Sequence, residues 1–139
     1  MAGRTCVTTT RVRFGETDAA GIVFYPTFFA WFDLGVQTML RDAPGGLLAD
    51  GRMRYPVPIV EAGARFTAPL FFDDAIAIRT VVASLGTSSM RFEHVVERDG
   101  VEVASGFEVR VLVDSGARRI AAVALPDDLR AYLGAGADR

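Results

Sequence analysis

The chain of 139 residues has the length of one domain, half of its residues are apolar, and its formal net charge is −2. This near balance excludes the strong basic field that attracts nucleic acid or a membrane surface. All 15 basic residues are arginine, which excludes a lysine Schiff base, and the single cysteine, Cys6, excludes an intrachain disulfide or a zinc site built from cysteines. The N-terminus lacks the apolar core of a secretory signal, and no apolar run approaches the ~20 residues that cross a bilayer, so residues 1–139 are predicted to form one cytoplasmic domain.

The first two predicted elements are a strand and a long helix. Thr5 to Phe14 is rich in β-branched residues and alternates Val12 and Phe14 with arginines, as a strand does. The helix is predicted from Thr27 to Arg41; Pro26 suits its first turn, and Thr27 is expected to cap it. This helix is apolar around much of its circumference, and a helix of that kind is normally wrapped by a sheet. Its apolar face includes Phe28, Trp31, Phe32, Gly35 and Met39.

The segment between these elements, Glu16 to Pro26, places a carboxylate and a glycine turn directly before the helix. An aspartate with the ordinary pKa of ~3.9 is ionised at neutral pH, so Asp18 can attack a carbonyl carbon or deprotonate water. Backbone N–H groups at a helix start lack partners within the helix, so the Tyr25 N–H can hold an oxyanion. Gly21 lets the chain turn tightly between the two. On local grounds alone, the commoner role of such an aspartate is to stabilise a turn.

The rest of the chain is predicted to be mainly strands. Residues 42–55 are rich in glycine and charge, which predicts a loop with one short helical turn. The strands that follow are predicted at Val57 to Phe66, Ala75 to Ser84, Thr87 to Arg98, Val101 to Val113 and Arg118 to Val123. In the fourth of these, valines alternate with Glu108 and Arg110, which places apolar and charged residues on opposite faces. Asp99-Gly100 predicts a hairpin turn, and residues 126–133 predict one or two amphipathic helical turns.

One strand, one helix and then four or five antiparallel strands is the order expected when a curved sheet wraps a central helix. The ordered residues Arg13 to Asp18, Ala20 to Val23, Tyr25-Pro26 and Trp31 to Asp33 resemble the signature of the 4-hydroxybenzoyl-CoA thioesterase family of the hotdog superfamily. Looser similarity extends to His94. The resemblance implies an α+β hotdog fold, in which five or six strands wrap a long helix, and an acyl-CoA thioesterase that forms dimers and often tetramers.

The resemblance also assigns roles within the signature. It implies that Asp18 is the catalytic carboxylate, that the Tyr25 backbone N–H polarises the thioester carbonyl, and that Gly21, Ile22 and Val23 lie beside the substrate. The Tyr-Pro pair is similar to the aryl-CoA branch of the family, which favours an aromatic acyl group of hydroxybenzoyl-CoA or benzoyl-CoA type. No metal or redox cofactor is implied, since CoA is part of the substrate.

Four further polar residues have two interpretations each. By resemblance, Asp33 lies close to the bound acyl group and Ser89 lines the pocket, but a solvated helix aspartate and a solvent-facing strand serine explain them equally well. His94 is the sole histidine and lacks the sequence context of a catalytic triad, so a structural role is the better prediction. Glu61 is predicted to point outward from its strand.

The basic residues expected to contact the CoA phosphates are missing from one segment of the chain. Where aryl-CoA relatives carry basic residues, this chain has Gly86-Thr87-Ser88, which leaves Arg91, Arg65 or Arg54 as substitutes. A thioesterase acting on acyl-carrier protein or on short-chain acyl-CoA therefore stays an alternative. A non-catalytic acyl-CoA binding module is the alternative from another class, and a dehydratase or hydratase of the same fold would need a histidine in a different motif.

Overall fold

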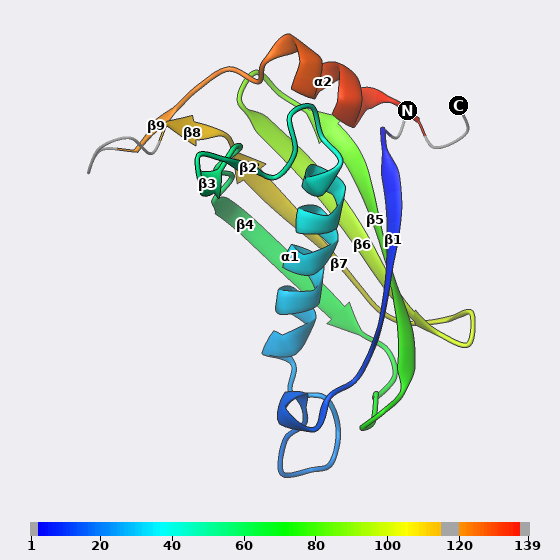
Figure 1. The fold of residues 1–139 in the computed structure, drawn as a ribbon. Helices are drawn as coiled ribbons and strands as arrows, with labels where there is room; N and C mark the ends of the chain where they lie inside the picture. Colours follow the sequence, from blue (N-terminus) through cyan, green and yellow to red (C-terminus); the bar gives the residue numbers. More distant parts are fainter. Residues whose placement is uncertain (1–2, 115–119, 137–139) are drawn as a thin grey trace.

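The computed structural model describes residues 3–114 and 120–136, in which one long helix lies across a curved sheet (Figure 1). Helix α1, Pro26–Arg41, packs against the concave face of a five-stranded antiparallel sheet. The predicted hotdog fold, an α+β arrangement of a central helix wrapped by strands, is therefore confirmed. The main sheet has five strands, the smaller of the two numbers expected.

The strands of this sheet run in the spatial order β1-β5-β6-β7-β4. Their bounds are β1 Thr5–Arg11, β4 Ile59–Phe66, β5 Ala75–Leu85, β6 Ser89–Arg98 and β7 Val101–Val111. Asp99 and Gly100 join β6 to β7 with φ angles of 53° and 76°, as the predicted hairpin turn requires. Strands β1 and β4 are the edges, so each keeps a row of backbone groups that no neighbour within the described residues pairs.

Two predictions about local structure are wrong. The first strand ends before Phe14, because Phe14–Glu16 form a 3-10 turn, η1. A hydrogen bond from the Arg13 N–H to the Glu16 carboxylate, at 2.7 Å, stabilises this turn. The loop of residues 42–55 contains a small hairpin instead of a helical turn. Its strands are β2 Leu48–Ala49 and β3 Arg52–Met53.

The C-terminal part agrees with the predicted helical turns. Helix α2 spans Asp127–Gly134 and buries Leu129 and Leu133. Strands β8 Val113–Asp114 and β9 Ala121–Ala122 pair with each other. Residues 118 and 119, the start of the last predicted strand, lie outside the described residues.

The core follows α1 in two parts. Near the start of the helix, Phe28, Trp31 and Phe32 pack against the sheet, and near its end Val36, Met39 and Leu40 pack against the sheet and α2. Gly35 lies where the helix comes closest to β5, and a Cβ atom there would overlap the hydroxyl oxygen of Thr80. Neither α1 nor α2, the helices among the described residues, is long and apolar enough to span a membrane.

Candidate active site

The loop that leads into α1 folds into a tight hairpin. Thr17 and Val23 form an isolated antiparallel bridge, and the Asp18 N–H donates to the Ile22 carbonyl oxygen at 2.9 Å. Gly21 closes the turn with a φ of 83°, a left-handed conformation that residues with a Cβ atom rarely adopt. The hairpin therefore holds Asp18 in a defined place just before the helix.

The side chain of Asp18 serves the turn with one oxygen only. Asp18 is half-buried, and its Oδ1 accepts a hydrogen bond from the Ala20 N–H at 2.8 Å, the contact of an ordinary turn aspartate. Within the described part of the chain, its second carboxylate oxygen has no hydrogen-bond partner. A structural role and a chemical role are therefore compatible in this one side chain.

Helix α1 begins beside the hairpin with a backbone donor that has no acceptor. Tyr25 is the N-cap residue, Pro26 is the first helical residue, and no side chain caps the helix. The prediction that Thr27 caps it is wrong, because the Thr27 hydroxyl donates to the Glu16 carbonyl oxygen at 3.4 Å. None of the hydrogen bonds among residues 3–114 and 120–136 uses the Tyr25 N–H. This donor, at the positive end of the helix dipole, is suited to an oxyanion.

An apolar pocket of about 380 Å³ opens beside Tyr25. It is lined by Ile22, Val23, Tyr25, Phe28, Phe66 and residues 67–70. The Phe66 ring lies 5.0 Å from the Phe28 ring and 6.5 Å from the Tyr25 ring, measured between centroids. Asp18 and Gly21 lie in the adjoining hairpin and not in the lining. The pocket can therefore receive a flat apolar group next to Tyr25, the residue whose N–H has no acceptor within the described residues.

Glu16, which the sequence analysis did not single out, connects the end of β1, the hairpin and the helix. Its side chain is only 13% exposed; Oε1 accepts from the Arg13 N–H at 2.7 Å, and Oε2 accepts from Trp31 Nε1 at 3.1 Å. Burial alone would raise the pKa of Glu16, but hydrogen bonds from Arg13 and Trp31 lower that pKa on balance. The bond from the Arg13 N–H to Glu16 is the glutamate half of a capping box, but no sequence signature marks it, because that signature begins with Ser, Thr, Asp or Asn and position 13 is arginine.

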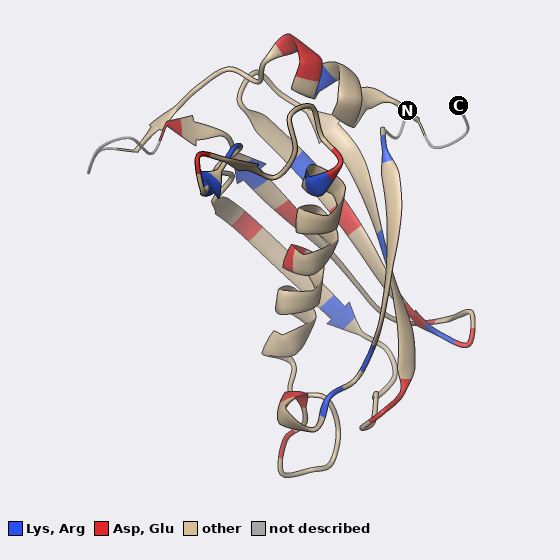
Figure 2. Ribbon diagram, viewed as in Figure 1, with Lys and Arg blue, Asp and Glu red and all other residues tan. Residues whose placement is uncertain are grey.

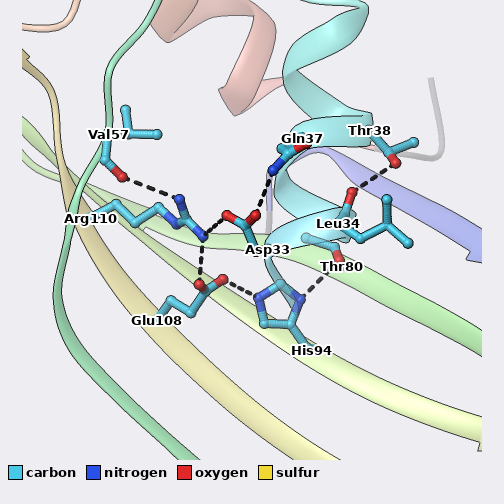
Figure 3. A network of polar contacts seen from close by, with 9 residues as sticks. All are labelled: Asp33, Leu34, Gln37, Thr38, Val57, Thr80, His94, Glu108 and Arg110. Carbon is cyan, nitrogen blue, oxygen red and sulfur yellow. Dashed lines mark hydrogen bonds and ion pairs between the residues drawn. The ribbon is translucent and has the colours of Figure 1, made fainter. Parts of the chain in front are cut away.

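A second group of polar side chains lies between α1 and the sheet (Figure 3). Arg110 Nη2, from β7, donates to Asp33 Oδ1 of α1 at 2.9 Å and to Glu108 Oε1 at 2.7 Å. The other Glu108 oxygen lies 2.7 Å from His94 Nε2, and His94 Nδ1 lies 2.9 Å from the Thr80 hydroxyl. Thr80, His94 and Glu108 are almost fully buried. We call these five residues the buried network; it connects α1 to β5, β6 and β7.

The buried network decides the environment of two residues with open interpretations. His94 is enclosed in the core and stacks on the Phe32 ring at 4.6 Å between centroids, which supports the predicted structural role. Asp33 is not a freely solvated helix aspartate, because it is ion-paired with Arg110 and also accepts a hydrogen bond from Gln37. Its side chain is 42% exposed, so it lies at the border between the core and the open face of α1.

Two of the three charged residues of β7, Glu108 and Arg110, face the core, whereas charged residues of a surface strand normally face solvent. The alternation of apolar and charged residues is as predicted, but Glu108 and Arg110 are buried against α1, whereas Phe107 and Val109 are half-buried. Figure 2 shows most charged positions at strand ends and loops, with exceptions within α1 and the sheet. The inward orientation is tolerated because each charge meets a partner from another element.

The family described as the thioesterase-like superfamily matches residues 12–133. This chain belongs to the thioesterase-like superfamily. The 4-hydroxybenzoyl-CoA thioesterase of Pseudomonas sp. (strain CBS-3) is 28% identical over 126 residues, which cover 85% of this chain and 89% of that protein. A 1,4-dihydroxy-2-naphthoyl-CoA hydrolase of Synechococcus sp. (strain CC9605) is 31% identical over 128 residues, covering 88% of this chain and 85% of that protein.

Solved structures agree with this assignment. A gentisyl-coenzyme A thioesterase is 38% identical with a TM-score of 0.78, covering 92% of this chain and 98% of that one. A 4-hydroxybenzoyl-CoA thioesterase, an aspartate-to-asparagine variant in complex with 4-hydroxybenzoyl-CoA, is 26% identical with a TM-score of 0.82, covering 94% of this chain and 99% of that one. The resemblance to the 4-hydroxybenzoyl-CoA thioesterase family is thereby confirmed, and the protein is a thioester hydrolase.

One chain of this thioesterase does not bring all the predicted site residues together. Ser89 begins β6 at the end of the sheet near α2, where its carbonyl oxygen accepts from the Gly86 N–H at 2.8 Å. The hairpin with Asp18 lies at the opposite end of the molecule, beside the start of α1 (Figure 1). Within one subunit, therefore, Ser89 is remote from Asp18.

The arginines considered for the CoA phosphates lie in two places. Arg65 and Arg91 line a shallow depression of about 490 Å³, and Arg91 lies 4.2 Å from the centroid of the Phe107 ring. Alternate residues of β6 are buried against α1, so Arg91 points away from the helix, to the outer face of the sheet. Arg54 packs against Gly45 in the loop after α1. Glu61 is exposed on β4, as predicted.

Proposed function

We propose that this thioesterase hydrolyses aromatic acyl-CoA esters, of hydroxybenzoyl-CoA or benzoyl-CoA type, to the free acid and CoA. The observation that carries the proposal is that Tyr25, whose N–H has no acceptor among the described residues, lines an aromatic pocket next to the Asp18 hairpin. The names of the relatives, which refer to hydroxybenzoyl-, gentisyl- and dihydroxynaphthoyl-CoA, support a ring in the acyl position.

In the proposed reaction, the Tyr25 N–H donates a hydrogen bond to the carbonyl oxygen as that atom becomes an oxyanion. A donor of this kind contributes roughly 10²–10³ in rate. Asp18 supplies the other half, either by attacking the carbonyl carbon to form a mixed anhydride that water then cleaves, or by deprotonating the attacking water. In both routes the C–S bond breaks and CoA leaves as its thiol. Neither route needs a metal or redox cofactor, and both fit the cytoplasm, where a free thiol such as Cys6 stays reduced.

We further infer that the active enzyme is a homodimer, or a tetramer of two such dimers. Edge strand β4 exposes Ile59, Val60 and Phe66, with Val60 63% exposed, and such an edge is stabilised by pairing with a second copy. The partner's Asp33 and the partner's Ser89 are then proposed to approach the acyl group. Sedimentation velocity tests this: Val60→Arg should shift the protein to monomers and lower turnover, whereas an unchanged assembly would contradict pairing through β4.

A carrier-protein thioester is the second candidate, favoured by one observation. The turn before β6 reads Gly86-Thr87-Ser88 and has no basic residue for the nucleotide of CoA. Comparing kcat/KM for one acyl group on CoA and on acyl-carrier protein separates the two substrates. A preference of more than tenfold for the carrier-protein ester would replace CoA in the proposal.

A thiol-release screen tests the acyl group. It compares benzoyl-, hydroxybenzoyl- and phenylacetyl-CoA with straight-chain esters, and we expect the highest kcat/KM for an aryl ester. A higher value for a straight-chain ester would contradict the aromatic assignment. Saturable binding without release of thiol from any ester would instead favour a non-catalytic binding module.

A further inference from the structure

Two carboxylates stand two residues apart in the hairpin region, and their surroundings differ. Both side-chain oxygens of Glu16 accept hydrogen bonds: Oε1 from the Arg13 N–H, and Oε2 from the Trp31 indole and from the Arg13 guanidinium at 3.2 Å. The side chain is 13% exposed. Asp18 is half-buried and uses only Oδ1, within its own turn. Glu16 therefore lacks a free oxygen for a ligand, whereas Asp18 keeps one as far as the described residues are concerned.

The contacts of Glu16 reach both groups of the proposed chemistry. Its carbonyl oxygen accepts from the Phe24 N–H at 2.9 Å, one residue before Tyr25. Its side chain holds Trp31, which is 3% exposed and lies in the second turn of α1. Asp18 follows Glu16 by two residues. The distance between the Asp18 carboxylate and the Tyr25 N–H thus depends on how Glu16 is held against the helix.

We propose that Glu16 is a positioning residue for catalysis: through Trp31 and the Phe24 backbone, it holds the Asp18 hairpin against the start of α1 in the reactive geometry. The inference rests on the proposed function, since it acts through Asp18. A misplacement of about 1 Å in such a geometry is enough to lower the rate by roughly 100-fold. The hydrogen bond from Trp31 is the anchor, because that indole is fixed in the core and packs edge-to-face on Phe28 at 5.1 Å between centroids.

The test is steady-state kinetics of four variants with an aryl-CoA ester, below the melting temperature of each. Glu16→Ala should lower kcat by about 10- to 100-fold and leave KM within about threefold, because it moves the reacting groups and spares the pocket lining. Glu16→Gln keeps one acceptor oxygen and should recover part of the loss. Trp31→Phe removes the donor but keeps an aromatic ring, and should lower kcat by about 3- to 10-fold. Glu102→Ala, at an exposed carboxylate on β7, is the matched control with unchanged kcat.

The same substitutions in an Asp18→Asn background separate positioning from general damage. If Glu16 acts through Asp18, Glu16→Ala should not lower the residual rate of the Asp18→Asn variant further, since the two substitutions remove the same effect. A wild-type kcat for Glu16→Ala and Trp31→Phe, or an equal loss in the Asp18→Asn background, would overturn the inference and leave the role of Asp18 intact. A wild-type rate for Asp18→Asn alone would overturn the proposed mechanism and, with it, this role of Glu16.

Discussion

The hairpin before α1 and the buried network beneath its middle both contain aspartate, yet they are held in different ways. The hairpin closes on contacts within a few residues, such as Asp18 with Ala20 and Ile22. Among the described residues, one Asp18 oxygen and the Tyr25 N–H that follows the hairpin have no hydrogen-bond partner. The buried network joins residues as far apart as Asp33 and Arg110. Almost every buried polar atom in it has a hydrogen-bond partner. Unpaired polar groups beside a pocket indicate chemistry, whereas paired groups in the core indicate the positioning of elements.

The largest effect is expected at the hairpin. Asp18→Asn should lower kcat by about 10²–10⁴-fold, the range for losing a catalytic acid or base, without shifting the melting temperature by more than a degree or two. The amide can still accept the Ala20 hydrogen bond, so the turn should persist. Near wild-type turnover on every ester that the enzyme accepts would refute the assignment of Asp18.

Removing the guanidinium from the buried network should have the opposite pattern, in which the main loss is in stability and not in kcat. Arg110→Met leaves Glu108 and Asp33 without their cation, which should lower the free energy of unfolding by about 3–5 kcal/mol. Urea denaturation measures this. Arg79→Met is the matched control, because its ion pair with Glu97 is at the surface and such pairs contribute about 0–1 kcal/mol.

A test that sharpens this prediction combines Arg110→Met with Glu108→Leu. If the penalty comes from an unpaired buried charge, the second substitution should recover part of the lost stability. Equal losses for Arg110→Met and Arg79→Met would contradict the view that the network fixes α1 on the sheet.

A smaller effect is expected at the contact of α1 with β5. Gly35→Ala should lower the free energy of unfolding by about 1–3 kcal/mol, because the added Cβ atom overlaps the Thr80 hydroxyl and forces the helix outward. Thermal unfolding checks this value. The double variant with Thr80→Ala relieves the overlap, so a cost that stays the same there would show that crowding is not the cause.

The smallest effect is a dependence on pH that comes from Glu16. Its pKa is lowered in the folded protein, so its contribution to stability is fully present above the unfolded pKa of about 4.3 and is lost as pH falls through the folded pKa. The difference in melting temperature between wild type and Glu16→Gln should therefore narrow as the pH falls below about 4.3. A difference that is constant from pH 7 to pH 3 would contradict an ionised Glu16.

The parts of the molecule that could be predicted are those decided by neighbouring residues. The hairpin turn at Asp99-Gly100, the helix after Pro26 and the glycine turn at Gly21 each follow from local backbone preferences. The cap predicted at Thr27 failed because its hydroxyl found a more distant acceptor, the Glu16 carbonyl oxygen, which no local rule indicates.

The inward orientation of Glu108 and Arg110 could not be predicted, since alternation along a strand reveals two faces but not which one is buried. That choice depends on partners from α1 and β6, Asp33 and His94, which are distant in sequence. The distance of Ser89 from Asp18 in one chain likewise depends on the path of the whole sheet.

By itself, the order of residues from Arg13 to Asp33 indicated the family, and with it the hotdog fold, through its resemblance to a known signature. The turn and the helix start that precede the expected chemistry were also indicated locally, because turns, helix starts and apolar periodicity are short-range properties. Only the tertiary structure decided which polar groups stay unpaired beside a pocket and which are paired with one another in the core. The physical reason is that a buried charge is tolerated only with a partner, and for Glu108 and Arg110 most of those partners come from other elements of the fold.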